Sequence, residues 1–223
     1  MKIFLATASP DEVRWATESS LAEGVVVTPT QLAEAVSRRG GSTRDLLAEI
    51  CEVAPVPVCA AVRSVAGADI YRDGRKLAKI SDQILVQVPL VEDAIPAIGR
   101  LRSEGVRVVA NLVFTPAQAL LAAKAGAYMV QVPVDELDQI GEDGAAVVRE
   151  VRGIFSLHAM ECDVVADCPA HGAQFSRCAG AGADVITVTT DVLHNLLLHP
   201  LTDRGMDRLL RELSEHSHPQ ATV

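Results

Sequence analysis

Eight short apolar runs rich in β-branched residues recur along the chain, and segments with helix-start signals separate them. The clearest run, Ile-Leu-Val-Gln-Val-Pro at residues 84–89, is typical of a buried parallel strand that ends at a proline. Eight strands that alternate with helices predict an α/β fold, a (β/α)8 TIM barrel, with an extra C-terminal helix. The other seven runs lie at residues 2–6, 24–28, 57–62, 106–113, 128–134, 163–166 and 184–188.

Several of the expected helices carry explicit start signals. Ser9 and Glu12 have the spacing of a capping box, and Thr115 and Gln118 repeat it before the sixth helix. No segment rich in Gly, Pro or Ser divides the chain, so we expect residues 1–223 to form a single domain.

Composition and charge limit the partners that the chain can have. Apolar residues make up 49% and aromatic residues 3%, which suits a Val, Ile, Leu and Ala core. The net charge of -9 argues against nucleic acid and against anionic membrane surfaces. No apolar run reaches the roughly 18 residues that span a bilayer, and the first nine residues are better explained as a strand than as a signal peptide.

The five cysteines are odd in number and mostly fall inside predicted elements, which indicates a reduced, cytoplasmic protein. A zinc site would need Cys162 and Cys168 to share one ion. They lie at opposite ends of the seventh run, roughly 20 Å apart at about 3.3 Å per residue. We therefore expect no metal, and we also expect no cofactor.

Polar side chains interrupt the apolar runs near their ends, where TIM barrels place their sites. A buried amide such as Gln87 needs hydrogen-bond partners. One interpretation is a pocket for a neutral, carbonyl-bearing ligand held by amide donors, and the other is a polar network that fills the barrel. The expected inward polar residues are Thr28, Gln87, Asn111 and Gln131, above a floor of Val26, Cys59, Ala61 and Leu85.

Two further groups follow strands six and seven. Cys168 and His171 have a spacing that allows a thiolate–imidazole pair, with Asp167 orienting the imidazole; the alternative is a buried thiol and a surface histidine. Asp135 and Glu136 could act as general bases or bind a cationic ligand, and the alternative is a solvated pair that caps the next helix.

Five segments carry a resemblance to a known family. The longest begins Asn-Leu-Val-Phe-Thr-Pro-Ala-Gln within residues 111–126, and the others lie at residues 24–30, 86–89, 137–144 and 199–203. On these segments the chain resembles the transaldolases, and especially the short branch that includes fructose-6-phosphate aldolase. The resemblance covers nearly the whole chain and implies a barrel of the transaldolase type.

The resemblance also implies a Schiff base between a lysine on the fourth strand and a ketose carbonyl. Gln87 stands at that position, and a carboxamide cannot form an imine. The four lysines, Lys2, Lys76, Lys79 and Lys124, are expected at the chain start or on helices. None of them is predicted at the C-terminal end of a strand.

Other positions that the resemblance assigns to chemistry also differ. The strand-one aspartate and the phosphate-binding cations are missing, so we expect a sugar-phosphate dianion to be repelled. In order along the chain, Ala6 replaces an aspartate, Thr28 an asparagine, Ala61 a Glu or Gln, Glu136 an arginine, and Cys168-Pro169-Ala170 a Ser-x-Arg/Lys pair that follows Asp167.

Three hypotheses of function follow. The first is a lyase, isomerase or condensing enzyme that acts without a Schiff base on a non-phosphorylated carbonyl or sugar-like compound in a specialised biosynthetic pathway. The second is a catalytically inactive binding or scaffold protein, and the third is an ordinary transaldolase or fructose-6-phosphate aldolase. For the first, the catalytic candidates are Gln87, Asn111, Asp167 and Cys168, and the substrate-binding candidates are Ala6, Thr28, Cys59, Gln131, Asp135 and Glu136.

The last helix is amphipathic, with three arginines and three leucines between residues 204 and 213. In the resembling family this helix packs on a neighbouring subunit, so the resemblance implies a homo-oligomer. The alternative is that the helix docks on its own barrel.

Overall fold

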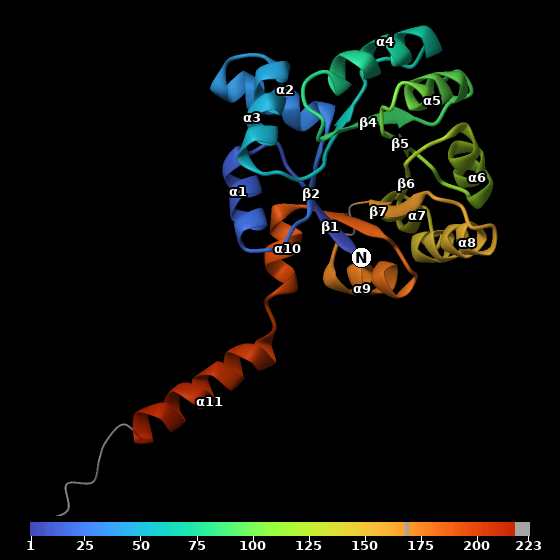
Figure 1. Ribbon diagram of the computed structural model, residues 1–223. Coiled ribbons are helices and arrows are strands. Elements are labelled where there is room, and N and C mark those ends of the chain that lie inside the picture. The colour runs from blue at the N-terminus through green and yellow to red at the C-terminus, as the bar shows by residue number, and fades with distance from the viewer. Residues whose placement is uncertain (168–169, 217–223) are drawn as a thin grey trace, which may run out of the picture.

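The computed structural model describes residues 1–167 and 170–216, and within them eight parallel strands close into a barrel in sequence order (Figure 1). The (β/α)8 barrel predicted from the alternating pattern is therefore confirmed. The strands are β1 (Lys2–Ala6), β2 (Gly24–Val27), β3 (Val58–Ala61), β4 (Ile84–Pro89), β5 (Val108–Asn111), β6 (Met129–Pro133), β7 (Asp163–Asp167) and β8 (Val185–Val188).

Helices surround the barrel, and the short helix α7 is one that the sequence pattern does not predict. Among the described helices, none combines the length and the apolar character that a bilayer crossing needs. The helices are α1 (Pro10–Glu18), α2 (Pro29–Arg39), α3 (Thr43–Val53), α4 (Gly67–Ala78), α5 (Ala94–Ser103), α6 (Pro116–Ala125), α7 (Val134–Gln139), α8 (Gly144–Leu157), α9 (Gly172–Gly180), α10 (Thr190–Leu196) and α11 (Pro200–His216).

The capping box expected at α1 forms only in part. Ser9 Oγ accepts a hydrogen bond from the Glu12 backbone N–H, as predicted. The Glu12 carboxylate does not return to Ser9, because Glu12 Oε2 accepts from Thr7 Oγ1 and Thr190 Oγ1, each at 2.6 Å. Glu12 therefore ties the β1–α1 loop to the start of α10, and a tertiary contact replaces the local one.

The capping box at α6 forms completely. Thr115 Oγ1 accepts from the Gln118 N–H, and Gln118 Oε1 accepts from the Thr115 N–H. We expect Thr115→Ala to lower the free energy of unfolding by about 1 kcal/mol. Urea titration followed by emission of Trp15, the single tryptophan, measures this change.

The matched control is Thr30→Ala in the first turn of α2, because the Thr30 hydroxyl has no hydrogen-bond partner among the described residues. We expect that variant to stay within about 0.5 kcal/mol of the wild type. Equal effects of the two substitutions would contradict the capping role of Thr115.

Two apolar layers hold the fold together. The outer faces of the strands pack against the helices, and the inner faces fill the barrel with buried side chains. Gly24 leaves room for the Phe4 ring, since a Cβ at Gly24 would lie 2.4 Å from Phe4 Cε1. The inner layer consists of Phe4, Val26, Cys59, Leu85, Val109, Met129, Val165 and Val185. We call this layer the floor.

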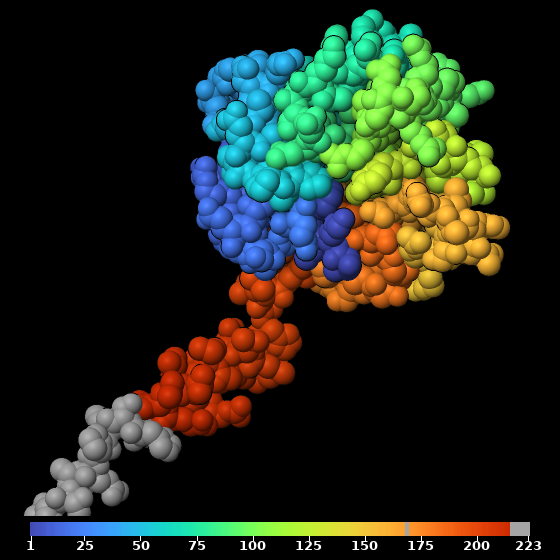
Figure 2. All heavy atoms as spheres, in the orientation of Figure 1, coloured from blue at the N-terminus to red at the C-terminus, as the bar shows by residue number. Residues whose placement is uncertain are grey.

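The helix α11 extends away from the barrel and does not cover it (Figures 1 and 2). Its leucines Leu209, Leu210 and Leu213 are 46%, 58% and 56% exposed. In this structure α11 therefore does not dock on its own barrel, which was the alternative expected from the sequence.

Candidate functional site

One layer of inward-facing positions lies directly above the floor. Side chains two apart on a strand share a face, so the residue two places after each floor residue also faces into the barrel. The pairing of Ala61 with Gln87 and of Pro89 with Asn111 fits this alternation. We call the resulting set the upper layer: Ala6, Thr28, Ala61, Gln87, Asn111, Gln131, Asp167 and Thr187.

The predicted floor is confirmed for Val26, Cys59 and Leu85. Ala61 was expected with them, but it follows Cys59 by two positions on β3 and pairs with Gln87, so it lies one layer higher.

Gln87 and Gln131 are joined across the upper layer. Gln87 Nε2 donates to Gln131 Oε1 at 2.6 Å, and the two side chains are 3% and 4% exposed. Gln87 Oε1 and Gln131 Nε2 have no hydrogen-bond partner among the described residues. The two amides therefore satisfy each other only in part. The acceptor Gln87 Oε1 and the donor Gln131 Nε2 remain for a ligand.

Asn111 is a second source of unused hydrogen-bonding capacity. Its Oδ1 is buried and has no partner among the described residues. The next residue, Leu112, has a φ of +57°, a left-handed conformation that costs a residue with a side chain on the order of 1–2 kcal/mol. A lone buried acceptor and a strained backbone residue at a strand end are features that concentrate at functional sites.

Asp167 at the end of β7 binds Thr187 on β8. Thr187 Oγ1 donates to Asp167 Oδ1 at 2.5 Å, and the Thr187 side chain is fully buried. No arginine or lysine among the described residues forms an ion pair with Asp167. Sequence reasoning missed Thr187, although a polar residue within the run Val-Ile-Thr-Val was a signal that could have identified it.

The Cys59 thiol belongs to the floor and is chemically inert as a nucleophile. Burial raises the pKa of the Cys59 thiol far above its usual value, and the negative charge of Asp167 raises it further. The thiol therefore stays protonated near neutral pH and contributes apolar surface. A substrate-binding role for Cys59 stays a prediction.

Thr28 and Ala6 are both tied to the start of α2 by Gln31. Thr28 Oγ1 accepts from the Gln31 N–H at 3.2 Å, and Gln31 Nε2 donates to the Ala6 carbonyl at 3.0 Å. Thr28 is thus the N-cap of α2, which sequence reasoning did not assign. The substrate-binding roles of Ala6 and Thr28 stay predictions.

Asp135 and Glu136 lie on α7 and not in a loop. Asp135 Oδ2 accepts from Gln139 Nε2 at 2.6 Å, and Glu136 is exposed. This arrangement favours the solvated, structural interpretation of the two residues. Their roles as substrate-binding groups stay predictions.

Cys168 lies outside the described residues, so the thiolate–imidazole pair cannot be placed. His171 Nδ1 accepts from the Gln174 N–H and caps α9, while Asp167 binds Thr187. The contact between Asp167 and His171 that the pair requires is therefore not formed. Within residues 1–167 and 170–216 no group of three His, Cys, Asp or Glu side chains is placed to hold a metal ion.

A groove of about 690 Å³ opens beside Ala6 and runs between α1, α2 and α10. Glu12 lies on its wall and has no ion-pair partner in the part of the chain that the structure describes, and Arg39 forms an ion pair with Glu49 at 2.8 Å. Sequence reasoning missed this groove because its residues come from segments far apart in the chain. Its charged lining is Asp11, Glu12, Glu34, Arg38, Arg39, Glu49 and Asp191, with more acids than bases.

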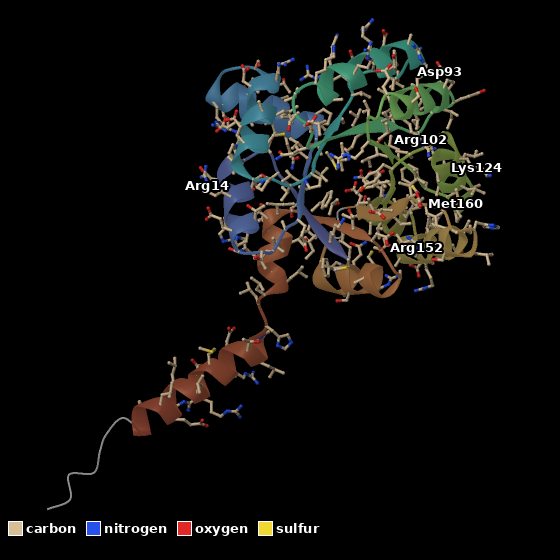
Figure 3. All side chains as sticks on the ribbon, in the orientation of Figure 1. Arg14, Asp93, Arg102, Lys124, Arg152 and Met160 are labelled. Atoms are coloured by element: carbon tan, nitrogen blue, oxygen red, sulfur yellow. The ribbon has the colours of Figure 1, made fainter. Side chains whose placement is uncertain are left out.

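The lysines all lie away from the upper layer. Lys2 begins β1 and so lies at the opposite end of the barrel from Ala6. Lys76 is on α4 beside Asp73, and Lys79 ends that helix. Lys124 is on α6, on the outside of the ring of helices (Figure 3).

The comparisons with known proteins agree with the barrel. Residues 19–223 match the family model described as "Transaldolase/Fructose-6-phosphate aldolase". A "Probable transaldolase" of Herpetosiphon aurantiacus is 39% identical over 210 residues, which cover 94% of this chain and 93% of that protein. A second, from Clostridium perfringens, is 33% identical over 96% of this chain and 98% of its own length. The chain therefore belongs to the transaldolase/fructose-6-phosphate aldolase family.

Proposed function

We propose that this protein is an enzyme that transfers a proton next to the carbonyl of a non-phosphorylated compound, without forming a Schiff base. Such a step is common to isomerases, lyases and condensing enzymes, and a specialised biosynthetic pathway is the setting we propose. The observation that carries the proposal is the buried pair Gln87–Gln131, which has unused amide valences, together with the Asp167 carboxylate at the end of β7, the strand next to β6.

The chemistry needs a base and a place for developing negative charge. Asp167 takes the proton from the carbon next to the carbonyl, and the electron pair of the broken C–H bond forms the C=C bond of an enolate. The enolate oxygen accepts hydrogen bonds from Gln131 Nε2 and from the second N–H of Gln87 Nε2. Donors of this kind, fixed in a buried site, stabilise an oxyanion strongly because they need no reorganisation.

The proton can return to the same carbon or to its neighbour, which gives exchange or isomerisation. Attack of the enolate on a second carbonyl gives condensation, and the reverse gives cleavage. Asn111 Oδ1, which is buried and has no partner among the described residues, is suited to accept a hydrogen bond from a hydroxyl group of the substrate.

Electrostatics support a substrate without phosphate. Asp167 has no cationic partner among the described residues, and the groove beside Ala6 holds more carboxylates than guanidinium groups. A phosphate dianion brought near these carboxylates would be repelled, whereas a neutral or cationic compound would not.

One observation favours the binding or scaffold alternative. The hydrogen bond between Gln87 and Gln131 already satisfies one valence of each side chain, as a structural network would. The names of the relatives favour ordinary transaldolase chemistry, which requires an amine within reach of the carbonyl. Proton exchange and imine trapping separate the three functions.

Exchange of C–H for C–D in D2O tests the proposal without knowledge of the natural substrate. Dihydroxyacetone and hydroxyacetone serve as probes, and proton NMR follows the loss of the signal next to the carbonyl. We expect the wild-type protein to accelerate exchange, Asp167→Asn to abolish it, and the control Asp82→Asn, at an exposed position just before β4, to retain it. Exchange no faster than in buffer would contradict the proposed function.

For the C-terminal helix we propose packing on a second copy of the chain. The exposed Leu209 and Leu213 are four residues apart and share one face of α11. We expect Leu209→Asp combined with Leu213→Asp to lower the molecular mass measured by analytical ultracentrifugation. The control Arg208→Ser should keep the mass of the wild type. A monomeric wild type would refute the proposed assembly.

A further inference from the structure

The hydroxyl of Thr187 is the only described hydrogen-bond donor to the Asp167 carboxylate. Thr187 lies on β8 and Asp167 on the neighbouring β7, and Oγ1 donates to Oδ1 at 2.5 Å. Hydrogen bonds that hydroxyl groups donate to carboxylates are charge-assisted and stronger than those between neutral groups. A fully buried threonine thus determines where one oxygen of Asp167 lies.

The other oxygen, Oδ2, has no hydrogen-bond partner among the described residues, and no described cation pairs with the carboxylate. The negative charge of Asp167 raises the pKa of the Cys59 thiol, and Cys59 belongs to β3 on another part of the barrel wall. Asp167 also follows the floor residue Val165 by two positions on β7, so it lies on the inner face of the barrel above the floor. A single donor orients it, and its second oxygen is left for another group.

From this geometry we infer that Thr187 is a positioning residue for the reaction. It holds Oδ1 of Asp167 toward β8 and leaves Oδ2 to take the substrate proton. This inference rests on the proposed function and adds to it a residue that binds neither the substrate nor the reacting atoms. The proton moves from carbon to Oδ2 and returns from Oδ2, or from solvent after exchange.

Loss of the hydroxyl leaves the carboxylate without a fixed orientation, which affects the chemical step more than binding. General base catalysis contributes about 10²–10⁴ in rate, and a base out of position loses part of that factor. We expect Thr187→Val, which keeps the shape of the side chain, to lower kcat for deuterium exchange of dihydroxyacetone about 30-fold with little change in KM. Thr187→Ser keeps a hydroxyl and should restore most of kcat.

The matched control is Thr7→Val. Thr7 is also buried, and its Oγ1 donates to the Glu12 carboxylate at 2.6 Å. This substitution removes the same kind of hydrogen bond from a contact between the β1–α1 loop and α1. We expect it to leave kcat unchanged within about twofold. Equal losses of kcat in the two valine variants would show that a general structural effect, and not positioning of Asp167, explains the result.

Crystal structures of the Thr187 variants test the inference without turnover. In Thr187→Val we expect the Asp167 carboxylate to leave the position that it has in the wild type, and in Thr187→Ser to keep it. An unmoved carboxylate in Thr187→Val would overturn the positioning role even if the wild type exchanges. If the wild type does not catalyse exchange, the proposed function is refuted. If the carboxylate still moves in Thr187→Val, Thr187 keeps its role as the group that orients Asp167.

Discussion

Replacement of Gln87 by leucine is expected to lower the rate of deuterium exchange about 100-fold or more, because one donor to the enolate oxygen is lost. The substitution also leaves Gln131 Oε1 buried without its donor, at a cost of about 1–3 kcal/mol in the free energy of unfolding. The exchange assay measures the first effect, and urea titration measures the second.

Two further variants separate these effects. The double variant Gln87→Leu with Gln131→Leu removes both partners, so we expect stability near that of the wild type and no exchange. The control Gln83→Leu changes a glutamine that precedes β4 by one residue and lies near the opposite end of the strand from Gln87. Its Oε1 has no hydrogen-bond partner within residues 1–167 and 170–216, so we expect full exchange activity. Wild-type exchange in the double variant would contradict the role of the amide pair.

Truncation of Phe4 to alanine is expected to produce the largest loss of stability, about 3–5 kcal/mol. The Phe4 ring is buried in the floor against Gly24, so its removal leaves a cavity that the surrounding strands cannot close. Urea titration of Trp15 emission gives the difference in unfolding free energy.

An exposed apolar side chain provides the comparison for Phe4. Leu157 ends α8 and is 80% exposed, so Leu157→Ala should change stability by less than about 0.5 kcal/mol. A loss of less than about 1 kcal/mol in the free energy of unfolding of Phe4→Ala would contradict this expectation. It would mean that the floor repacks around the missing ring and that the barrel interior is loosely filled.

The local sequence pattern predicted the elements because each strand and helix has its own period and its own start signals. Polar residues near the ends of the apolar runs predicted that Gln87 and Gln131 face inward, and each follows a buried floor residue by two positions. Their burial agrees with that prediction.

The contacts between strands could not be predicted in the same way. Gln87 and Gln131 are 44 residues apart, and they meet only because β4, β5 and β6 are neighbours in a closed barrel. Glu12 has the spacing of a local capping box, yet its carboxylate binds Thr190, 178 residues later. The local spacing of Ser9 and Glu12 cannot indicate that Thr190 will bind Glu12 instead. Thr190 comes near Glu12 only because β1 pairs with β8 when the barrel closes.

The barrel provides a frame on which the upper layer can change without loss of the fold. The floor and the helix contacts are apolar and carry the stability, whereas amide and carboxylate groups lie above them. TIM barrels commonly separate the two functions in this way. Membership of the family therefore accounts for the architecture, whereas the chemistry depends on the side chains of the upper layer.

Borohydride trapping is the most direct test of a site that acts on a carbonyl without an amine. The protein is incubated with dihydroxyacetone under conditions in which exchange proceeds, reduced with sodium borohydride, and its intact mass is measured. We expect an unmodified mass, because none of Lys2, Lys76, Lys79 and Lys124 lies near the upper layer. A reduced ketose adduct mapped to any of these lysines would contradict it and indicate Schiff-base chemistry.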